Sequence, residues 1–342
     1  MKPARRVGAT IVVGVAAASL ISCGGSGDQA RQTVAVNGVQ VPPRIKIASG
    51  SVGGAYFPMG NAIAQVLSTK LPGVLATGEA SGGSAQNIRM LDGRQIDFAL
   101  SNASITFPAI RGGSDGFDKP YPVRAVMTLH ASVNLFVALA SSGIRTIADM
   151  RGRRVSVGPA GGGWDAYTKP ILAAHGLTFA DFTPVYEGQS SAVDMLTDKN
   201  VDAIFVGGSI PHATIMSAQA GHEIVLVQFD RAALDRVNAE HPTIQKYLVP
   251  AHTYKGQDTD FWAVDAGPAQ LIAREDADAD MIYLITKTLY ENRDMIAKMT
   301  PAGKEITPER VAMDIGIPYH EGSLRYFKEA NLWHPKAAAT TN

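Results

Sequence analysis

Three glycine-rich segments are the parts of this sequence best suited to bind a ligand. They are Gly53–Tyr56, Gly82–Asn87 and Gly161–Trp164, and each lies at the start of a helical pattern. A helix N-terminus presents unpaired N–H groups and about half a positive charge, so carboxylates and phosphates bind there. Glycine lets a ligand approach the backbone, but it also serves tight strand-to-helix turns. Three such loops at one face indicate a site for a small anion.

Polar side chains accompany these loops. Ser84 and Asn87 are three residues apart on one helical turn, so both can reach one ligand, and Ser84 can also be an N-cap. Ser101 and Asn102 follow a buried strand, where they can bind a ligand or close an Asx turn. We favour Tyr56 and Trp164 as cleft walls over simple packing.

Gly161–Ala166 also fits the dinucleotide pattern G-x-G-x-x-A, with Glu187 near the expected acidic position. We reject a dehydrogenase because the segment lies in the second half of a chain with an export signal. Of the eight histidines none forms a metal-ligand array, and no P-loop or nucleophile elbow occurs. We therefore expect no metal, no cofactor and no catalytic residue. The net charge is zero, so the sequence lacks the excess of basic residues that is typical of nucleic-acid-binding proteins.

The first 22 residues are typical of a secretory signal peptide. Three positive charges in Met1–Arg6 precede the uncharged run Val7–Leu20, which is too short to span a membrane. The only cysteine, Cys23, follows in a Leu-x-Ser-Cys context that resembles a bacterial lipobox; the alternative is an incidental cysteine beside the cleavage site. We expect an exported protein, periplasmic or on the cell surface, that is anchored to the membrane by a lipid on Cys23.

The elements that position the loops occur twice. Strand, glycine loop and helix succeed one another in Arg44–Thr69 and again in Arg154–His175, and the helix end and strand around Asp97 recur 105 positions later around Asp202. Such units build mostly parallel sheets flanked by helices, with ligands at the carboxyl ends of the strands. The sequence predicts an α/β fold of two lobes. Its expected division is a flexible linker over 23–44, lobe 1 over 45–139 and 229–342, and lobe 2 over 140–228.

Within this plan, residues 123–140 and 222–229 are expected to be strands that cross between the lobes. Residues 281–299 are expected to form one long amphipathic helix that packs on lobe 1.

Six motifs in this order resemble the TAXI family, the solute-binding proteins of one branch of the TRAP transporters. They are Ile47–Pro58, Gly78–Asn87, Val157–Gly162, Val201–Gly208, Thr253–Asp258 and His320–Gly322.

The resemblance implies a type II periplasmic-binding-protein fold that closes on its ligand. It also implies delivery of a small carboxylate, amino-acid or keto-acid like, to the permease subunits of an ion-driven TRAP transporter. The partners are then a small anionic or zwitterionic ligand, the permease and the membrane. The contact residues implied by position are Ser51, Gly53, Gly54, Tyr56, Ser84, Asn87, Ser101, Asn102, Gly161, Gly163, Trp164, Gln189 and Gly207.

One departure concerns the ligand. The family pattern Gly-Pro-Pro-Gly-Ser-Gly-Thr is replaced at Gly158–Trp164, where a hydroxyl is lost at Gly162 and an indole stands at Trp164. This puts glutamate in doubt. No arginine lies in the glycine motifs, so we expect helix N-termini and hydroxyls to bind the ligand, and not Arg89 or Arg94. The alternatives are an exported enzyme of the same fold, with Asp165 or Glu187 as acid or base, and a sensor that presents its ligand to a membrane receptor.

Overall fold

The computed structural model describes residues 32–112 and 116–334. The chain divides into two units, residues 1–32 and 33–342, and the fold below is that of the second unit. The predicted signal peptide and Cys23 lie outside the described residues, so both stay predictions. Within the described residues, no helix is both long enough and apolar enough to cross a membrane.

A β-hairpin occupies part of the segment expected to be a flexible linker. Strands β1 (Val34–Val36) and β2 (Val39–Val41) pair antiparallel, and the turn residues Asn37 and Gly38 have φ of 51° and 83°. Asn-Gly favours the tight turn with two positive φ angles that joins two strands. Val36 and Val41 are buried in the core of the first sheet, which fixes the hairpin. The prediction of a flexible linker up to residue 44 was therefore wrong for residues 34–44.

The first sheet has five strands in the order β4-β3-β5-β14-β6. Strands β4, β3 and β5 are parallel, whereas β14 is antiparallel to both β5 and β6. Their bounds are β3 Arg44–Ala48, β4 Leu75–Glu79, β5 Phe98–Asn102, β6 Val123–Thr128 and β14 Ala269–Arg274.

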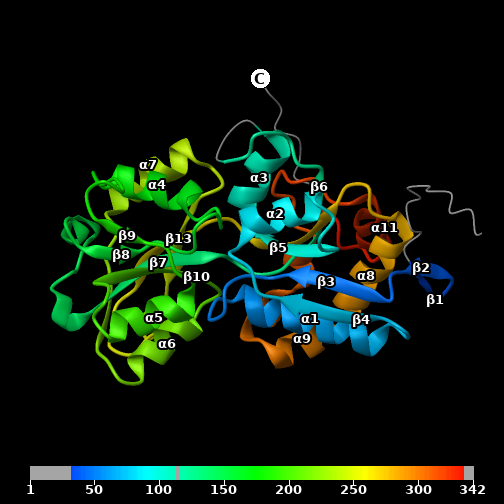
Figure 1. The fold of residues 1–342 in the computed structure, drawn as a ribbon, viewed down its shortest axis with the longest axis horizontal. Helices are drawn as coiled ribbons and strands as arrows, with labels where there is room; N and C mark the ends of the chain where they lie inside the picture. Colours follow the sequence, from blue (N-terminus) through cyan, green and yellow to red (C-terminus); the bar gives the residue numbers. More distant parts are fainter. Residues whose placement is uncertain (1–31, 113–115, 335–342) are drawn as a thin grey trace, which may run out of the picture. The chain divides into compact units, whose positions relative to one another are not determined.

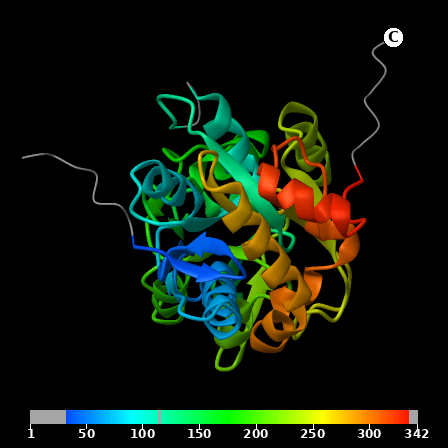
Figure 2. The same ribbon diagram turned by 90° about the vertical axis from the view of Figure 1, so that its right-hand side faces the viewer.

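Helices cover both faces of this sheet (Figure 1). One face carries α1 (Tyr56–Lys70) and α9 (Arg293–Met299), and the other carries α2 (Ser84–Asp92) and α3 (Ala103–Arg111). In Figure 2, α8 (Ala279–Glu291) and α11 (Glu321–Glu329) lie side by side. The C-terminal segment thus completes the first core, as predicted. Two short elements, η3 (Pro301–Glu305) and α10 (Pro308–Val311), connect these helices.

The long amphipathic helix expected over 281–299 is two helices that meet at Asn292. The Asn292 side chain donates to the carbonyl of Thr288 at 2.8 Å. Asparagine offers the backbone such local hydrogen bonds in place of the helical ones, which explains the break. Helix α8 buries its apolar face in the first core, as the pattern predicted, whereas α9 buries Ile296 and leaves Met299 exposed.

The second sheet has seven strands. The order is β12-β13-β7-β10-β8-β9, and β11 also pairs with β7. Their bounds are β7 Val133–Leu139, β8 Arg154–Ser156, β9 Thr183–Val185, β10 Ala203–Gly208, β11 Ile224–Leu226, β12 Gln245–Val249 and β13 Phe261–Asp265. Figure 1 shows α4 and α7 on one face and α5 and α6 on the other. The helices are α4 Asp165–Ala174, α5 Gln189–Thr197, α6 Ala213–Gln219 and α7 Arg231–Glu240, with short turns η1 Ala140–Ser142 and η2 Ile147–Met150.

The two sheets share a plan, as the internal repeat predicted. The order β4-β3-β5-β14 in the first sheet corresponds to β9-β8-β10-β7 in the second. Asp97 accepts a hydrogen bond from the N–H of Lys46 at 2.8 Å, and Asp202 accepts one from the N–H of Arg154 at 2.8 Å. Each aspartate thus joins the first strand of its half to the third.

The chain crosses between the sheets at residues 129–132 and 266–268. The first crossing lies within the run 123–140, which was expected to cross, whereas residues 222–229 do not cross, since β11 pairs with β7 in the second sheet. Strands β7, β12 and β13 belong to the second sheet and helix α7 packs against it, so residues 133–139 and 229–265 were assigned to the wrong lobe. The exact place of the first crossing was not visible in the run over 123–140, because β6 and β7 are both largely buried and show no regular polar alternation. The residues between the two strands include the polar side chains of His130 and Ser132.

Candidate functional site

A small cavity lies between the glycine loops of the two sheets. About 40 Å³ of it can hold the centre of a water-sized sphere, and the empty space rises to about 420 Å³ when space open to solvent is included. Eight of the predicted contact residues line this cavity: Ser51, Gly54, Tyr56, Ser84, Asn102, Trp164, Gln189 and Gly207. Their binding role stays a prediction, but the structure brings them together.

Five predicted contact residues do not line the cavity: Gly53, Asn87, Ser101, Gly161 and Gly163. Asn87 is buried, and its amide donates to the carbonyls of Ser49 at 2.8 Å and Leu100 at 2.7 Å. It ties α2 to the strands instead of facing a ligand. Ser101 is buried as well, and its hydroxyl lies 2.8 Å from that of Thr106 on α3.

The glycine loops contact each other directly. The N–H of Ala85 donates to the carbonyl of Gly162 at 3.1 Å, and the hydroxyl of Thr214 donates to the carbonyl of Gly53 at 3.0 Å. A Cβ atom on Gly162 would lie 2.1 Å from the carbonyl oxygen of Gly82. Glycine at this position therefore permits the two halves to close, whereas the sequence suggested a role in approaching the ligand.

Helix N-termini surround the cavity. Helix α1 begins at Tyr56, α2 at Ser84 and α5 at Gln189, and all three residues line the walls. No side chain of the described cavity wall carries a charge. The positive ends of the helix dipoles are therefore the local feature that favours an anion.

The hydroxyl groups come mainly from the first half. The buried Tyr56 hydroxyl makes no hydrogen bond within the protein, although the Ser84 and Ser132 side chains lie near it. Burial raises the pKa of Tyr56, so the phenol stays protonated and can donate. The Ser84 hydroxyl accepts from the N–H of Asn102 at 3.2 Å, which leaves its own proton free.

Gln189 has a different role from the one predicted. Its amide nitrogen donates to the carbonyl of Gly207 at 3.0 Å, and its amide oxygen accepts from the N–H of Gly207 at 3.1 Å. Both ends of the side chain are thus used within the second half. Gln189 shapes the wall by joining α5 to β10.

Trp164 is both a packed residue and a cavity wall. Its ring lies edge-on to Phe205 with centroids 5.9 Å apart, and beside Tyr167 at 6.2 Å. A Cβ on Gly158 would lie 2.5 Å from this indole, so Gly158 provides the space for it. The indole thus occupies room that a small polar residue would leave open.

Buried titratable groups lie beside the first crossing. The rings of His130 and Tyr56 meet edge-on with centroids 5.8 Å apart, and burial lowers the pKa of His130. Burial also lowers the pKa of His212 to about 4. Asp265 accepts from the N–H of Ser132 at 3.1 Å, and burial raises the pKa of Asp265 to about 6. None of the three side chains lines the cavity.

The residues considered for the alternative functions do not line the cavity. Asp165 pairs with Lys169, and Glu187 accepts from Ser191, and both lie outside the cavity wall. Arg89 donates to the carbonyl of Gly116, and Arg94 pairs with Asp276, so neither reaches the cavity. Among residues 32–112 and 116–334, no three metal-ligating side chains cluster.

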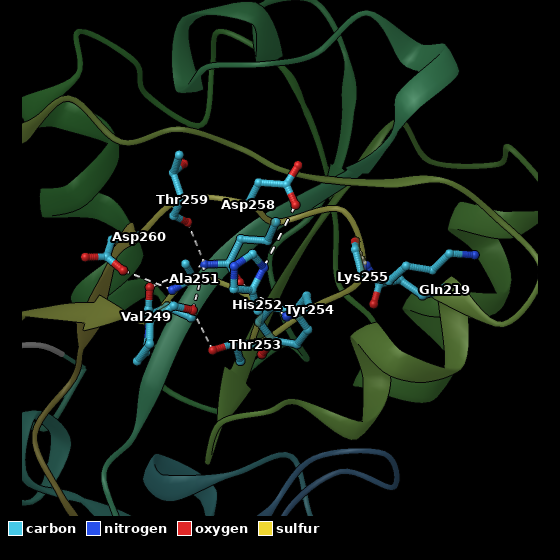
Figure 3. Close-up of polar contacts among 12 residues, drawn as sticks. Gln219, Val249, Ala251, His252, Thr253, Tyr254, Lys255, Asp258, Thr259 and Asp260 are labelled. Carbon is cyan, nitrogen blue, oxygen red and sulfur yellow. Dashed lines mark hydrogen bonds and ion pairs between the residues drawn. The ribbon is translucent and has the colours of Figure 1, made fainter.

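The motif Thr253–Asp258 lies in the loop between β12 and β13 (Figure 3). Asp260 accepts from the N–H of Ala251 at 2.9 Å, and Gln219 donates to the carbonyl of Lys255 at 2.9 Å. The Tyr254 hydroxyl accepts from the N–H of His212, the N-cap of α6. Since α6 carries Thr214, this loop supports the contact with Gly53 and does not line the cavity.

Three more lining residues, Ala55, Gly82 and Gly83, belong to the predicted glycine segments but were not named as contacts. The other five were not predicted from the sequence: Gly50, Ser132, Asn134, Tyr167 and Gly208. Asn134 had a usable signal, because it is a polar residue in the otherwise apolar strand β7. Tyr167 lies one helical turn after Trp164, which places both rings on one face of α4.

Residues 47–330 match the model of the NMT1-like family. Among solved structures, a protein of Bordetella bronchiseptica RB50 is 17% identical, with 87% of this chain and 92% of that chain covered and a TM-score of 0.51. The periplasmic aliphatic sulphonate binding protein SsuA from Escherichia coli is 15% identical, with 88% and 96% covered and a TM-score of 0.40. The alkanesulfonate-binding protein SsuA from Xanthomonas axonopodis pv. citri bound to MOPS is 15% identical, with 86% and 85% covered and a TM-score of 0.45. The fold is of the type II periplasmic-binding-protein class, as predicted. The sheets are mixed and not mostly parallel as expected, because β7 and β14 run antiparallel to all their neighbours.

Proposed function

Since the chain belongs to the NMT1-like family, we propose that it is an exported solute-binding receptor that captures a small carboxylate and delivers it to a membrane permease. The observation that carries this proposal is the cavity itself. It lies between two sheets, the N-termini of α1, α2 and α5 surround it, and hydroxyl groups face it. These groups suit an anion that is bound and released unchanged.

Mass spectrometry of the ligand that co-purifies with the protein tests this function. The protein is purified without added carboxylates, unfolded, and the released small molecules are identified and quantified. We expect one carboxylate at close to one equivalent. A thermal-shift screen with that compound then has to raise the unfolding temperature, because a ligand that binds the native state stabilises it. A protein that releases nothing and responds to no carboxylate or amino acid contradicts the proposal.

The proposed permease is of the TRAP type, and the chain its TAXI-type receptor. The support is the series of six motifs between Ile47 and Gly322. Uptake into proteoliposomes that contain the permease encoded beside this protein distinguishes the transport classes. We expect uptake to require the receptor and an ion gradient, and to proceed without ATP. Uptake driven by ATP hydrolysis contradicts the TRAP assignment but leaves the receptor function standing.

The proposed anchor is a lipid on Cys23. The support is the Leu-x-Ser-Cys context at the end of the apolar run and the absence of any other cysteine from the sequence. Metabolic labelling with a radioactive fatty acid should mark the wild type and not the Cys23→Ser variant. The variant should also lose its membrane association. Equal labelling of both proteins contradicts the anchor.

A further inference from the structure

The size and the charge of the cavity define a narrower ligand class than the proposed function does. This inference rests on that function and deepens it. Three properties of the cavity restrict the ligand: its volume in the closed arrangement, its lack of charged side chains, and its hydrogen-bond donors.

The volume is small because the two halves are in contact. Ala85 donates to Gly162, and Thr214 donates to Gly53, so the halves are joined at both glycine loops of the first half. The 40 Å³ open to the centres of water-sized spheres corresponds to about three or four water molecules. A ligand of roughly four to six non-hydrogen atoms fits such a space. A longer ligand would require these interlobe hydrogen bonds to break.

The charge of the wall limits the ligand to one negative group. The three helix N-termini each supply about half a positive charge, so together they offset one carboxylate but not two. The described wall contains no Lys or Arg to balance a second carboxylate, and no Asp or Glu to receive an ammonium group. An unpaired charge in such a site carries a large desolvation cost. Dicarboxylates and zwitterionic amino acids are therefore disfavoured.

The donors suit a carboxylate. The Tyr56 hydroxyl is buried without a hydrogen-bond partner in the protein, and the Ser84 hydroxyl, which accepts from the Asn102 N–H, can donate its proton to a ligand. The rings of Trp164 and Tyr167 also line the cavity and offer apolar surface for the remaining carbon atoms. The loss of the family hydroxyl at Gly162 and the gain of the indole at Trp164 both reduce the polar space.

We propose that the cavity binds a small monocarboxylate of two to four carbon atoms that carries no second charged group, with the Tyr56 hydroxyl as a donor to its carboxylate.

Isothermal titration of the full mature protein, refolded after removal of bound ligand, tests this proposal. One arm uses acetate, propionate, lactate and pyruvate, and the second uses malate, 2-oxoglutarate and glutamate. Propionamide serves as a neutral analogue of propionate, and methanesulfonate tests the other common monoanion. We expect at least one monocarboxylate to bind about 100-fold more tightly than every compound of the second arm. We expect no binding of propionamide.

The outcomes separate this inference from the proposed function. If a dicarboxylate or an amino acid binds and the monocarboxylates do not, the inference is wrong and the receptor function stands. If methanesulfonate binds more tightly than the carboxylates, the carboxylate assignment is wrong in both the inference and the proposed function. If no compound of either arm binds, the inference is wrong and the carboxylate receptor loses its support.

A conservative variant tests the role of the phenol. Tyr56→Phe should weaken binding of the preferred monocarboxylate at least tenfold without lowering the unfolding temperature of the free protein, since the hydroxyl has no partner in the protein. Tyr186→Phe is the matched control because Tyr186 is exposed and lies outside this cavity. Equal affinity of the Tyr56→Phe variant and the wild type contradicts the assigned contact.

Discussion

The two glycine-rich halves of this protein share a strand order but contribute differently to the cavity. The first half supplies the hydroxyls of Ser51, Tyr56 and Ser84. The second half supplies the rings of Trp164 and Tyr167, glycine backbone and two amides, Asn134 and Gln189, each of which is hydrogen-bonded to nearby backbone. A repeated topology therefore does not imply a repeated function. In the proposed receptor, the first half recognises the ligand and the second half closes over it.

The largest effect expected from this comparison concerns closure. Gly162→Ala places a Cβ about 2 Å from the Gly82 carbonyl oxygen, so the halves cannot approach as they do here. We expect the ligand affinity to fall about 100-fold, equivalent to about 2.7 kcal/mol, with little change in the unfolding temperature of the free protein. Isothermal titration measures the affinity. Gly221→Ala is the control because no atom lies within 4 Å of its added Cβ. Unchanged affinity in Gly162→Ala would show that the loop contact does not serve binding.

The second prediction concerns the crossing that joins the halves. Burial raises the pKa of Asp265 to about 6 in the folded protein, against about 3.9 in an unfolded chain. The folded state therefore holds the proton more tightly, so this contribution to stability is full below pH 4 and is lost as the pH rises through 6. Relative to Asp265→Asn, the wild type should lose about 2–3 kcal/mol of unfolding free energy between pH 4 and pH 7. Urea unfolding of both proteins at several pH values measures the difference, and parallel pH profiles contradict the prediction.

The third prediction tests whether Gln189, in the second half, stabilises the fold instead of contacting a ligand. Gln189→Ala removes two hydrogen bonds and leaves the backbone groups of Gly207 without their partners. The unfolding free energy should fall by about 1–3 kcal/mol. Ser191→Ala, on the same helix but exposed, should change it by less than about 0.5 kcal/mol. Urea unfolding of the two variants measures the difference. Equal stability would mean that the hydrogen bonds of Gln189 to Gly207 do not stabilise the contact between α5 and β10.

The smallest effect is expected for a single hydroxyl of the first half. Ser84→Ala removes one donor from the cavity and should weaken ligand binding about five- to tenfold, or about 1 kcal/mol. The lost bond to the Asn102 N–H also lowers the unfolding free energy by a similar amount, so titrations belong at a temperature where the variant is fully folded. If the variant binds the ligand as tightly as the wild type does, the Ser84 hydroxyl at the N-terminus of α2 does not contact the ligand.

Local chemistry made much of this fold predictable. Strand β3 and helix α1 begin within a few residues of their expected bounds, because alternation and helical periodicity are read over neighbouring residues. The repeat around Asp97 and Asp202 was visible for the same reason. The Asn37-Gly38 turn is also determined by neighbouring residues, so the hairpin at residues 34–41 could have been predicted.

Other features depend on residues far apart in the chain. The exact place of the first crossing within 123–140, and the second crossing at 266–268, were missed because a buried strand looks the same in either sheet. Asn87 and Gln189 were expected to face a ligand, since a polar residue near a helix start can bind either a ligand or backbone. Which of the two it binds depends on strands brought beside it by the fold, such as the carbonyl of Leu100 for Asn87.

The sequence by itself determined an α/β fold with two related halves, glycine loops at the carboxyl ends of strands, and the helices that follow them. These properties depend on the backbone freedom of glycine and on short-range periodicity. Only the tertiary structure decided that Gly162 serves closure, that Gln189 is used internally, and that the cavity is small and uncharged. Distances across the two halves are set by the packing of both sheets together, and no stretch of neighbouring residues contains that information.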